Sequence, residues 1–169
     1  MPMTFHLAVL GIGIIALLAA AAHDLLARTI PNAAPAMVAA SGLALRLEDG
    51  TVTVASCAAL FAFAACALFW RAGWLGGGDA KLLAAVALLL PPSQVLSTLV
   101  GVAGSGAVLA LPYLAARGRV ARPTPGRRFL TLRVRAWRAE LFRLRRGGPL
   151  PYGVAIAAGV LLSVLGPTQ

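Results

Sequence analysis

Long apolar stretches alternate with short polar or glycine-rich segments along this chain. A helix needs about 20 apolar residues to cross a bilayer. Phe5–Ala22 and Val52–Trp70 are close to this length and carry no formal charge. The last span is predicted over Pro149–Leu165. The 13 residues of Ala33–Leu45 can span only if their polar neighbours lie at the two interfaces.

The remaining apolar stretch, Leu82–Ala116, is too long for one crossing. As a single helix it would measure about 52 Å, well beyond the hydrocarbon core of a bilayer. Pro91-Pro92 divides it, because proline lacks an N–H and disfavours helix for the preceding residue. We therefore expect a short helix over 80–90 and a longer one over 93–115. The pattern predicts an all-α integral membrane protein with about six transmembrane helices, in a single membrane-embedded domain over 1–169.

Composition agrees with a membrane location. Sixty percent of the residues are apolar and 12% are charged, against about 25% charged residues in soluble domains. The net charge of +10 belongs to the segment 116–148, which holds eleven arginines and one glutamate, while four basic residues balance four acidic ones elsewhere. The net positive charge of the chain therefore comes from one loop, and it does not indicate nucleic-acid binding.

The distribution of basic residues predicts the orientation of the chain. With six spans both termini lie on one side, and the opposite side carries 14 of the 15 Lys and Arg residues. Only Arg46 lies on the side of the termini. The positive-inside rule then places the termini outside and the 116–148 loop in the cytoplasm.

Two of the five acidic residues lie where an apolar stretch meets a polar or glycine-rich edge. Asp24 follows the first span and Asp79 precedes the fourth, so both are expected at the cytoplasmic face. A carboxylate beside a membrane-spanning sequence is costly to hold, which makes a chemical role the first hypothesis. Two of them suggest a carboxylate dyad. Each alone could instead be structural, Asp24 at a helix end and Asp79 as a helix N-cap.

Short motifs surround both aspartates. Arg28 lies four residues after Asp24, so the two side chains are neighbours if the helix continues. Pro31 should stop that helix, and Asn32 suits the N-cap of the next one. Gly76–Gly78 supply a backbone that can take unusual dihedral angles and can be approached closely. Nucleotide binding by this stretch is discounted, because no strand precedes it and the phosphate-loop spacing is absent.

The ordered set of motifs resembles a known family. It consists of Asp24, an Ile-Pro-Asn that starts six residues later, Gly-x-Gly-Asp ending at Asp79, Lys81, and Pro-Tyr-Gly at 151–153. This set resembles the type IV prepilin peptidases, which are intramembrane aspartic proteases. The resemblance covers nearly the whole chain apart from 116–148, and it implies that Asp24 and Asp79 are catalytic without a metal or other cofactor. The surrounding motif residues that it implies for substrate binding are Gly76, Gly78, Lys81, Arg28, Pro31 and Asn32.

The resemblance also implies a biological role. Such an enzyme removes the leader peptide of prepilin-like proteins at the cytoplasmic face of the bacterial inner membrane, for pilus assembly or secretion. Longer family members carry an added cytoplasmic segment with paired cysteines and also methylate the cleaved pilin. This chain lacks that segment and looks like the short form associated with Flp/Tad-type pili, so no S-adenosylmethionine site is expected. Its partners would be a prepilin-like substrate and pilus-assembly proteins.

A carboxylate pair can hydrolyse an amide when one member is ionised and the other protonated. The ionised member takes a proton from water, and the protonated member hydrogen-bonds the scissile carbonyl. Asp79 is expected near a helix N-terminus and Lys81, which favours its charged form, whereas Asp24 is expected near a helix C-terminus. From the sequence we therefore expect Asp79 to be the base and Asp24 the acid.

The arginine-rich segment has its own pattern. Its apolar residues recur with 4-3-4-3 spacing, and arginines fill most of the remaining positions. This pattern predicts an amphipathic helix over 127–146 that lies on anionic lipid headgroups. Docking of a pilus-assembly partner is the alternative. The apolar positions are Leu130, Val134, Trp137, Leu141 and Leu144.

Two other functions stay open at this point. The chain could be a small transporter that uses Asp24 and Asp79 as proton or cation sites, although coupling sites usually lie near the middle of the bilayer. It could also be a non-catalytic membrane scaffold, for which the motifs would be coincidence. Activity without an ion gradient separates a peptidase from the transporter, and loss of function on Asp→Asn separates both from the scaffold.

Overall fold

A computed structural model describes residues 3–116 and 150–165 of the chain. These residues form only helices, which confirms the expected all-α class. The predicted amphipathic helix over 127–146, and all but the first residue of the 116–148 loop, lie outside the described residues. The helices are α1 (Met3–Ala27), α2 (Ala33–Glu48), α3 (Val52–Arg71), α4 (Gly77–Leu89), α5 (Pro92–Ala116) and α7 (Tyr152–Leu165).

The proline pair divides the long apolar stretch as expected. Helix α4 ends at Leu89, Leu90 is extended with φ −90° and ψ 153°, and α5 begins at Pro92. The extended conformation is the one that a following proline favours. The break lets the chain change direction between α4 and α5, so the stretch does not form one over-long helix.

The end of the first helix differs from the expectation. Pro31 was expected to stop it, but α1 already ends at Ala27. Arg28 takes the left-handed conformation, with φ 58°, and its N–H donates to the carbonyl of Asp24 at 2.8 Å. A left-handed residue directly after the last helical one is a common way for a helix to end. The helix therefore ends at this residue and not at Pro31.

Three of the six described helices are long and apolar enough to cross a membrane, namely α1, α3 and α5. The others are shorter, with 16 residues in α2, 13 in α4 and 14 in α7. Six crossings therefore stay a prediction. Helix α3 buries only Ala55 and Ala62 among its 20 residues. Soluble proteins rarely expose so much contiguous apolar surface, and this surface identifies a membrane protein.

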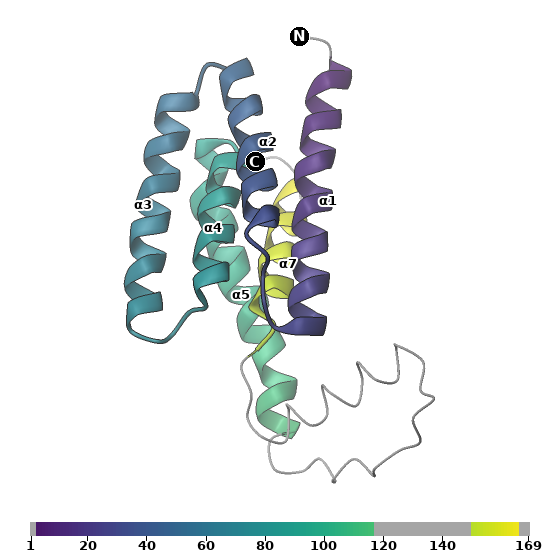
Figure 1. Cartoon of the computed structure of the whole chain (residues 1–169), viewed down its shortest axis with the longest axis vertical. Coiled ribbons are helices and arrows are strands. Elements are labelled where there is room, and N and C mark those ends of the chain that lie inside the picture. Colours follow the sequence, from purple (N-terminus) through teal and green to yellow (C-terminus); the bar gives the residue numbers. More distant parts are fainter. Residues whose placement is uncertain (1–2, 117–149, 166–169) are drawn as a thin grey trace. The chain divides into compact units, whose positions relative to one another are not determined.

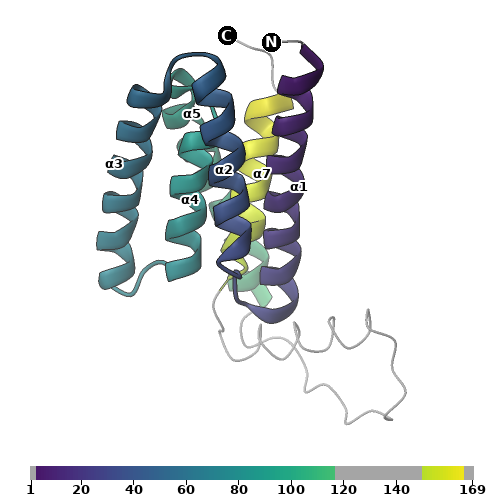
Figure 2. The same cartoon turned by 45° about the horizontal axis from the view of Figure 1, so that its top comes forward.

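The chain divides into two compact units, Met1–Ser105 with Pro151–Gln169, and Gly106–Leu150. The described part of the second unit is the end of α5 and Leu150. In the first unit, α4 contacts α2, α3 and α7, while α1 packs against α2 and α7 (Figures 1 and 2). This central position gives the short α4 protein neighbours on several sides.

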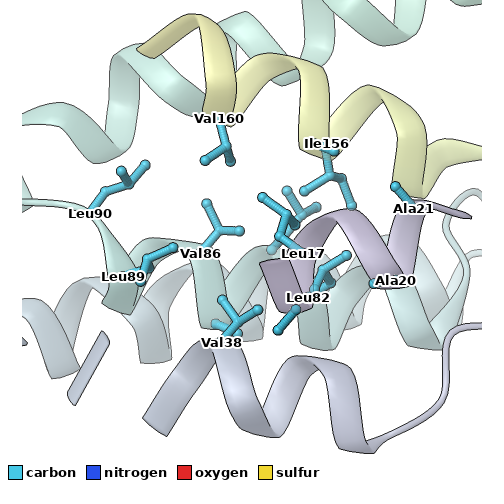
Figure 3. Packing of buried hydrophobic residues seen from close by; sticks show 14 of the residues in the cluster. Leu17, Ala20, Ala21, Val38, Leu82, Val86, Leu89, Leu90, Ile156 and Val160 are labelled. Atoms are coloured by element: carbon cyan, nitrogen blue, oxygen red, sulfur yellow. The ribbon is translucent and has the colours of Figure 1, made fainter. Parts of the chain in front are cut away.

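The core of the first unit lies between α1, α2, α4 and α7 (Figure 3). Helix α4 supplies most to it, with five buried residues, as expected for a helix enclosed by others. Side chains in this core pack against one another instead of against lipid, which is the main source of association between membrane helices. Members of this core with at most 1% exposure are Leu17, Ala20, Val38, Leu45, Leu82, Val86, Leu89, Ile156 and Val160.

Two glycines let helices approach to backbone contact. A Cβ on Gly42 of α2 would lie 2.6 Å from the backbone nitrogen of Leu89, and one on Gly159 of α7 would lie 2.6 Å from that of Val102. Both distances are too short for any side chain. Small residues at helix crossings are typical of membrane proteins, and these two fix how α2 meets α4 and how α7 meets α5.

Candidate active site

Both aspartates of the predicted dyad lie at one end of the first unit. There the last turn of α1 meets the first turns of α2, α4 and α7 (Figure 1). Asp24 belongs to the last turn of α1 and Asp79 to the first turn of α4. They line one cavity of about 290 Å³, so the two motifs that are 55 residues apart in the sequence meet in space. The cavity is also lined by Arg28, Thr29, Ile30, Gly76, Gly77 and Gly78.

Asp24 is buried, with 6% of its surface exposed. Its Oδ2 accepts a hydrogen bond from the backbone N–H of Gly153 at 2.9 Å. Gly153 is the second residue of α7, and a Cβ there would lie 3.1 Å from the same oxygen. The first turn of α7 is therefore packed directly against the carboxylate, a contact that no local pattern around Asp24 indicates.

The Pro-Tyr-Gly motif builds this contact. Pro151 is fully buried, and its carbonyl accepts the N–H of Val154 at 3.1 Å, which closes the first turn of α7. Tyr152 is half-buried and packs against the core.

Asp79 is the third residue of α4, and the N-cap of that helix is Gly76. The alternative of Asp79 as a helix N-cap is therefore wrong. The carboxylate accepts a hydrogen bond from the backbone N–H of Gly76, as a carboxylate three residues into a helix does in a capping box. Its Oδ1 is buried and has no hydrogen-bond partner in the part of the chain that the structure describes.

The two carboxylates share one site. Asp24 and Asp79 line the same cavity, where Asp24 is buried and Asp79 is half-buried. Two carboxylates in such a position do not both ionise easily, so the pair favours sharing a single proton. This is the charge state that general acid–base hydrolysis requires.

The glycines beside Asp79 serve close approach and not unusual dihedral angles. Gly76 has φ −70° and ψ 143°, an ordinary extended conformation, so that part of the expectation is wrong. A Cβ on Gly76 would lie 2.6 Å from Oδ2 of Asp79, and a Cβ on Gly78 would lie 2.9 Å from Cβ of Ile30. The Gly-x-Gly pattern therefore lets Asp79 fold back onto its own helix start and lets α4 meet the segment after α1.

Asn32 precedes α2 as expected but does not cap it with its side chain. Its Oδ1 instead accepts a hydrogen bond from Nζ of Lys81 at 2.9 Å. The expected side-chain cap is therefore wrong, because the oxygen that would cap α2 is bonded to α4. Pro31 contributes its carbonyl to the first turn of α2, where it accepts the N–H of Ala34 at 3.1 Å.

Arg28 reaches the cavity by a different route from the one expected. It does not follow Asp24 on a continuing helix, because α1 has ended. The left-handed turn places Arg28 among the residues that line the cavity all the same. His23 supports this turn, with Nδ1 2.6 Å from the carbonyl of Thr29. A carbonyl only accepts, so this nitrogen carries the hydrogen.

Comparison with known proteins identifies the family. Residues 11–111 match the type IV leader peptidase family, a region that contains Asp24 and Asp79 but ends before Pro151. No curated protein and no solved structure is significantly similar to the chain. Since the match covers more than half of the sequence, the chain belongs to the type IV leader peptidase family and is a membrane-embedded peptidase of that kind.

Proposed function

We propose that this protein is an intramembrane aspartic endopeptidase that removes the leader peptide of prepilin-like proteins. Cleavage takes place at the cytoplasmic face of the bacterial inner membrane and serves pilus assembly or secretion. The observation that carries the proposal is the single cavity that Asp24 and Asp79 line together. The family match supports a leader peptidase, and the paired carboxylates supply the aspartic chemistry.

The chemistry follows from the paired carboxylates. The ionised aspartate takes a proton from a water molecule, whose oxygen attacks the scissile carbonyl carbon while the protonated aspartate hydrogen-bonds the carbonyl oxygen. The resulting tetrahedral intermediate collapses when the aspartate that took the proton from water passes it to the leaving nitrogen and the C–N bond breaks. One carboxylate ends protonated and the other ionised, so the pair is ready for a second cycle.

The cavity favours an extended peptide as substrate. Three consecutive glycines, Gly76–Gly78, line it without side chains, so a peptide backbone can come close to the segment that carries Asp79. A substrate helix would need to unwind at this point, because a helix hides its carbonyl carbons behind its side chains and its own hydrogen bonds. Arg28, which also lines the cavity, adds a positive charge beside the pair.

The transporter alternative makes a different prediction about energy coupling. A peptidase needs no ion gradient, whereas a transporter that uses the two carboxylates does. The test is cleavage of a purified prepilin-like precursor by the protein in nanodiscs, where no gradient can exist, with the new N-terminus read by mass spectrometry. A single new N-terminus at the leader junction supports the proposal. No cleavage of any prepilin-like precursor tested, by folded protein, would overturn it.

A further inference from the structure

A groove between three helices of the first unit lies apart from the dyad. It has a volume of about 530 Å³ and is formed by α2, α3 and α4, with α4 packed against both of the others (Figures 1 and 2). Each helix contributes one face, because its lining residues are three, four and seven positions apart. They are Pro35, Ala36 and Ala39 with Asn32 just before α2, Ser56, Ala59, Leu60 and Phe63 on α3, and Lys81, Ala84, Ala85 and Leu88 on α4.

The groove opens toward the lipid. Leu60 and Phe63, which line it from α3, are 69% and 42% exposed, and they belong to the helix whose apolar surface identifies a membrane protein. Half of the lining residues are alanine or serine, so short side chains leave the space between the helices unfilled. An empty space forfeits packing on every side. The occupant must therefore come from the bilayer, either as a lipid chain or as an apolar helix of another protein.

One end of the groove carries a positive charge. Lys81 and Asn32 line this end, at the starts of α4 and α2, and neither of them lines the cavity of the dyad. An ammonium group has three N–H donors, and among the described residues only Asn32 accepts a hydrogen bond from Lys81. The Lys81 side chain is exposed, so its other donors can reach a ligand in the groove.

Shape and charge together favour a phospholipid over a helix. Lys81 and Leu88 are seven residues apart, so the groove runs for about 10 Å along α4. Two turns of a helix with their side chains, about 10 Å across, fill about 850 Å³, which is more than the groove holds, whereas an acyl chain is far thinner. A phospholipid also carries a negative phosphate at one end of its chains, where the groove has Lys81. Basic pockets between membrane helices at the cytoplasmic side bind anionic headgroups in this way.

We propose that this groove binds one anionic phospholipid, with its phosphate on Lys81 and one acyl chain between α2, α3 and α4. The lipid belongs to the leaflet at whose surface the dyad lies, because Lys81 follows Asp79 by two residues. Its phosphate accepts from the ammonium that also bonds Asn32, so a bound lipid adds to the link between the starts of α4 and α2. The inference concerns a second site and does not depend on peptide cleavage.

Photoreactive lipids test the site in the full chain. The protein is placed in nanodiscs with a trace of phosphatidylglycerol or phosphatidylcholine that carries a diazirine in one acyl chain, and labelled residues are identified by peptide mass spectrometry. Leu60 lines the groove, whereas its neighbour Phe61 does not and is 79% exposed. The ratio of labelling by phosphatidylglycerol to labelling by phosphatidylcholine cancels the reactivity of each residue. We expect this ratio to be several-fold higher at Leu60 than at Phe61.

Matched variants separate the charge from the groove. Lys81→Met should lower the ratio at Leu60 by about fivefold, the effect of one basic residue at an anionic surface, and Lys81→Arg should keep it. Arg71→Met is the control for charge, because Arg71 is exposed at the same end of α3 but does not line the groove. Ala36→Leu should fill the groove and lower the labelling of Leu60 by both lipids. Ala40→Leu, which is exposed on the same helix outside the groove, should not.

Three results would overturn the inference. Equal ratios at Leu60 and Phe61 in the wild type would show that the groove holds bulk lipid without selection. An unchanged ratio in Lys81→Met would remove the phosphate contact. Crosslinking of a prepilin-like precursor to Leu60→p-benzoylphenylalanine but not to Phe61→p-benzoylphenylalanine, without lipid selection, would assign the groove to a substrate helix. Since no lipid label requires cleavage, the proposed function is tested separately.

Discussion

Gly78 and Ile30 lie so close together that a Cβ on Gly78 would sit 2.9 Å from Cβ of Ile30. Gly78 belongs to α4 and Ile30 to the segment between α1 and α2. Their contact joins the Gly-x-Gly-Asp and Ile-Pro-Asn motifs at the cavity that both line. The spacing of the two aspartates depends on this contact, because Asp24 and Asp79 are each only a few residues away from it.

Gly78→Ala should therefore open the site. The added methyl group must push Ile30 or α4 aside, at a cost of about 1–3 kcal/mol for overpacking, and a shift of this kind between catalytic groups costs activity on the order of 100-fold. The measurement is kcat/KM for precursor cleavage together with the melting temperature. Gly11→Ala is the control, since a Cβ there meets nothing within 4 Å. Wild-type activity in Gly78→Ala would contradict this account of the motif.

Lys81 and Asn32 form the second link between the same two motifs, through the 2.9 Å hydrogen bond from Nζ to Oδ1. The bond is exposed, so we expect Lys81→Met or Asn32→Ala to cost less than about 1 kcal/mol of stability. If this link is the main role of Lys81, the two changes should reduce activity equally and the double mutant no further. A larger loss in Lys81→Met than in Asn32→Ala, read in kcat/KM, would instead indicate a direct contact of Lys81 with substrate.

Arg46 and Asp49 form an ion pair of unequal burial. The distance between Nη1 and Oδ2 is 2.6 Å, and the side chains are 3% and 35% exposed. Asp49→Asn leaves a buried guanidinium without its carboxylate and should cost about 3 kcal/mol. Arg46→Met leaves a carboxylate that water can reach and should cost about 1 kcal/mol. Thermal unfolding in detergent measures both, and a larger cost for Arg46→Met would contradict the argument from burial.

The same pair predicts a pH dependence. Burial raises the pKa of Asp49, but hydrogen bonds from Thr51 and the charge of Arg46 lower it by more, so the net pKa lies below the usual 3.8. A lowered pKa contributes stability that is complete above the unfolded value and is lost as the pH falls through the folded value. The melting temperature of the wild type should thus fall more below pH 4 than that of Asp49→Asn. Parallel curves for the two proteins would refute this.

The arginine-rich segment carries a prediction that depends on the sequence alone. If residues 127–146 form an amphipathic helix on anionic lipid, a peptide of this sequence should bind liposomes with phosphatidylglycerol much more tightly than neutral ones. The binding should weaken as salt is added. Equal binding to neutral liposomes, measured by tryptophan fluorescence of Trp137, would remove the electrostatic part of the hypothesis.

The apolar pattern predicts the helices well, because the thickness of a bilayer limits how long an apolar helix can be. The division at Pro91-Pro92 follows from backbone chemistry alone, and the extended Leu90 confirms it. The end of α1 was harder to predict from the sequence, because an arginine rarely takes a positive φ, as Arg28 does here. The burial of Arg46 could not be predicted from the sequence, because it depends on how α2 packs.

The sequence predicts which residues form the site, but it does not predict the contacts between them. Asp24 and Asp79 were identified from the cost of placing a carboxylate beside a membrane span, and the structure brings them to one cavity. The hydrogen bond from Gly153 to Asp24 joins residues 129 positions apart, and no periodicity or spacing encodes such a contact. Which aspartate is the base and which the acid stays a prediction from the sequence.

The most direct test of the central claim is cleavage of a co-expressed prepilin-like precursor, read as a mobility shift, by the wild type, Asp24→Asn and Asp79→Asn. Glu48→Gln is the matched control, because it removes a carboxylate outside the site. All four proteins must be present in the membrane in similar amounts. We predict complete processing by the wild type and the control, and none by either aspartate variant. Processing that survives both aspartate substitutions would contradict the carboxylate dyad.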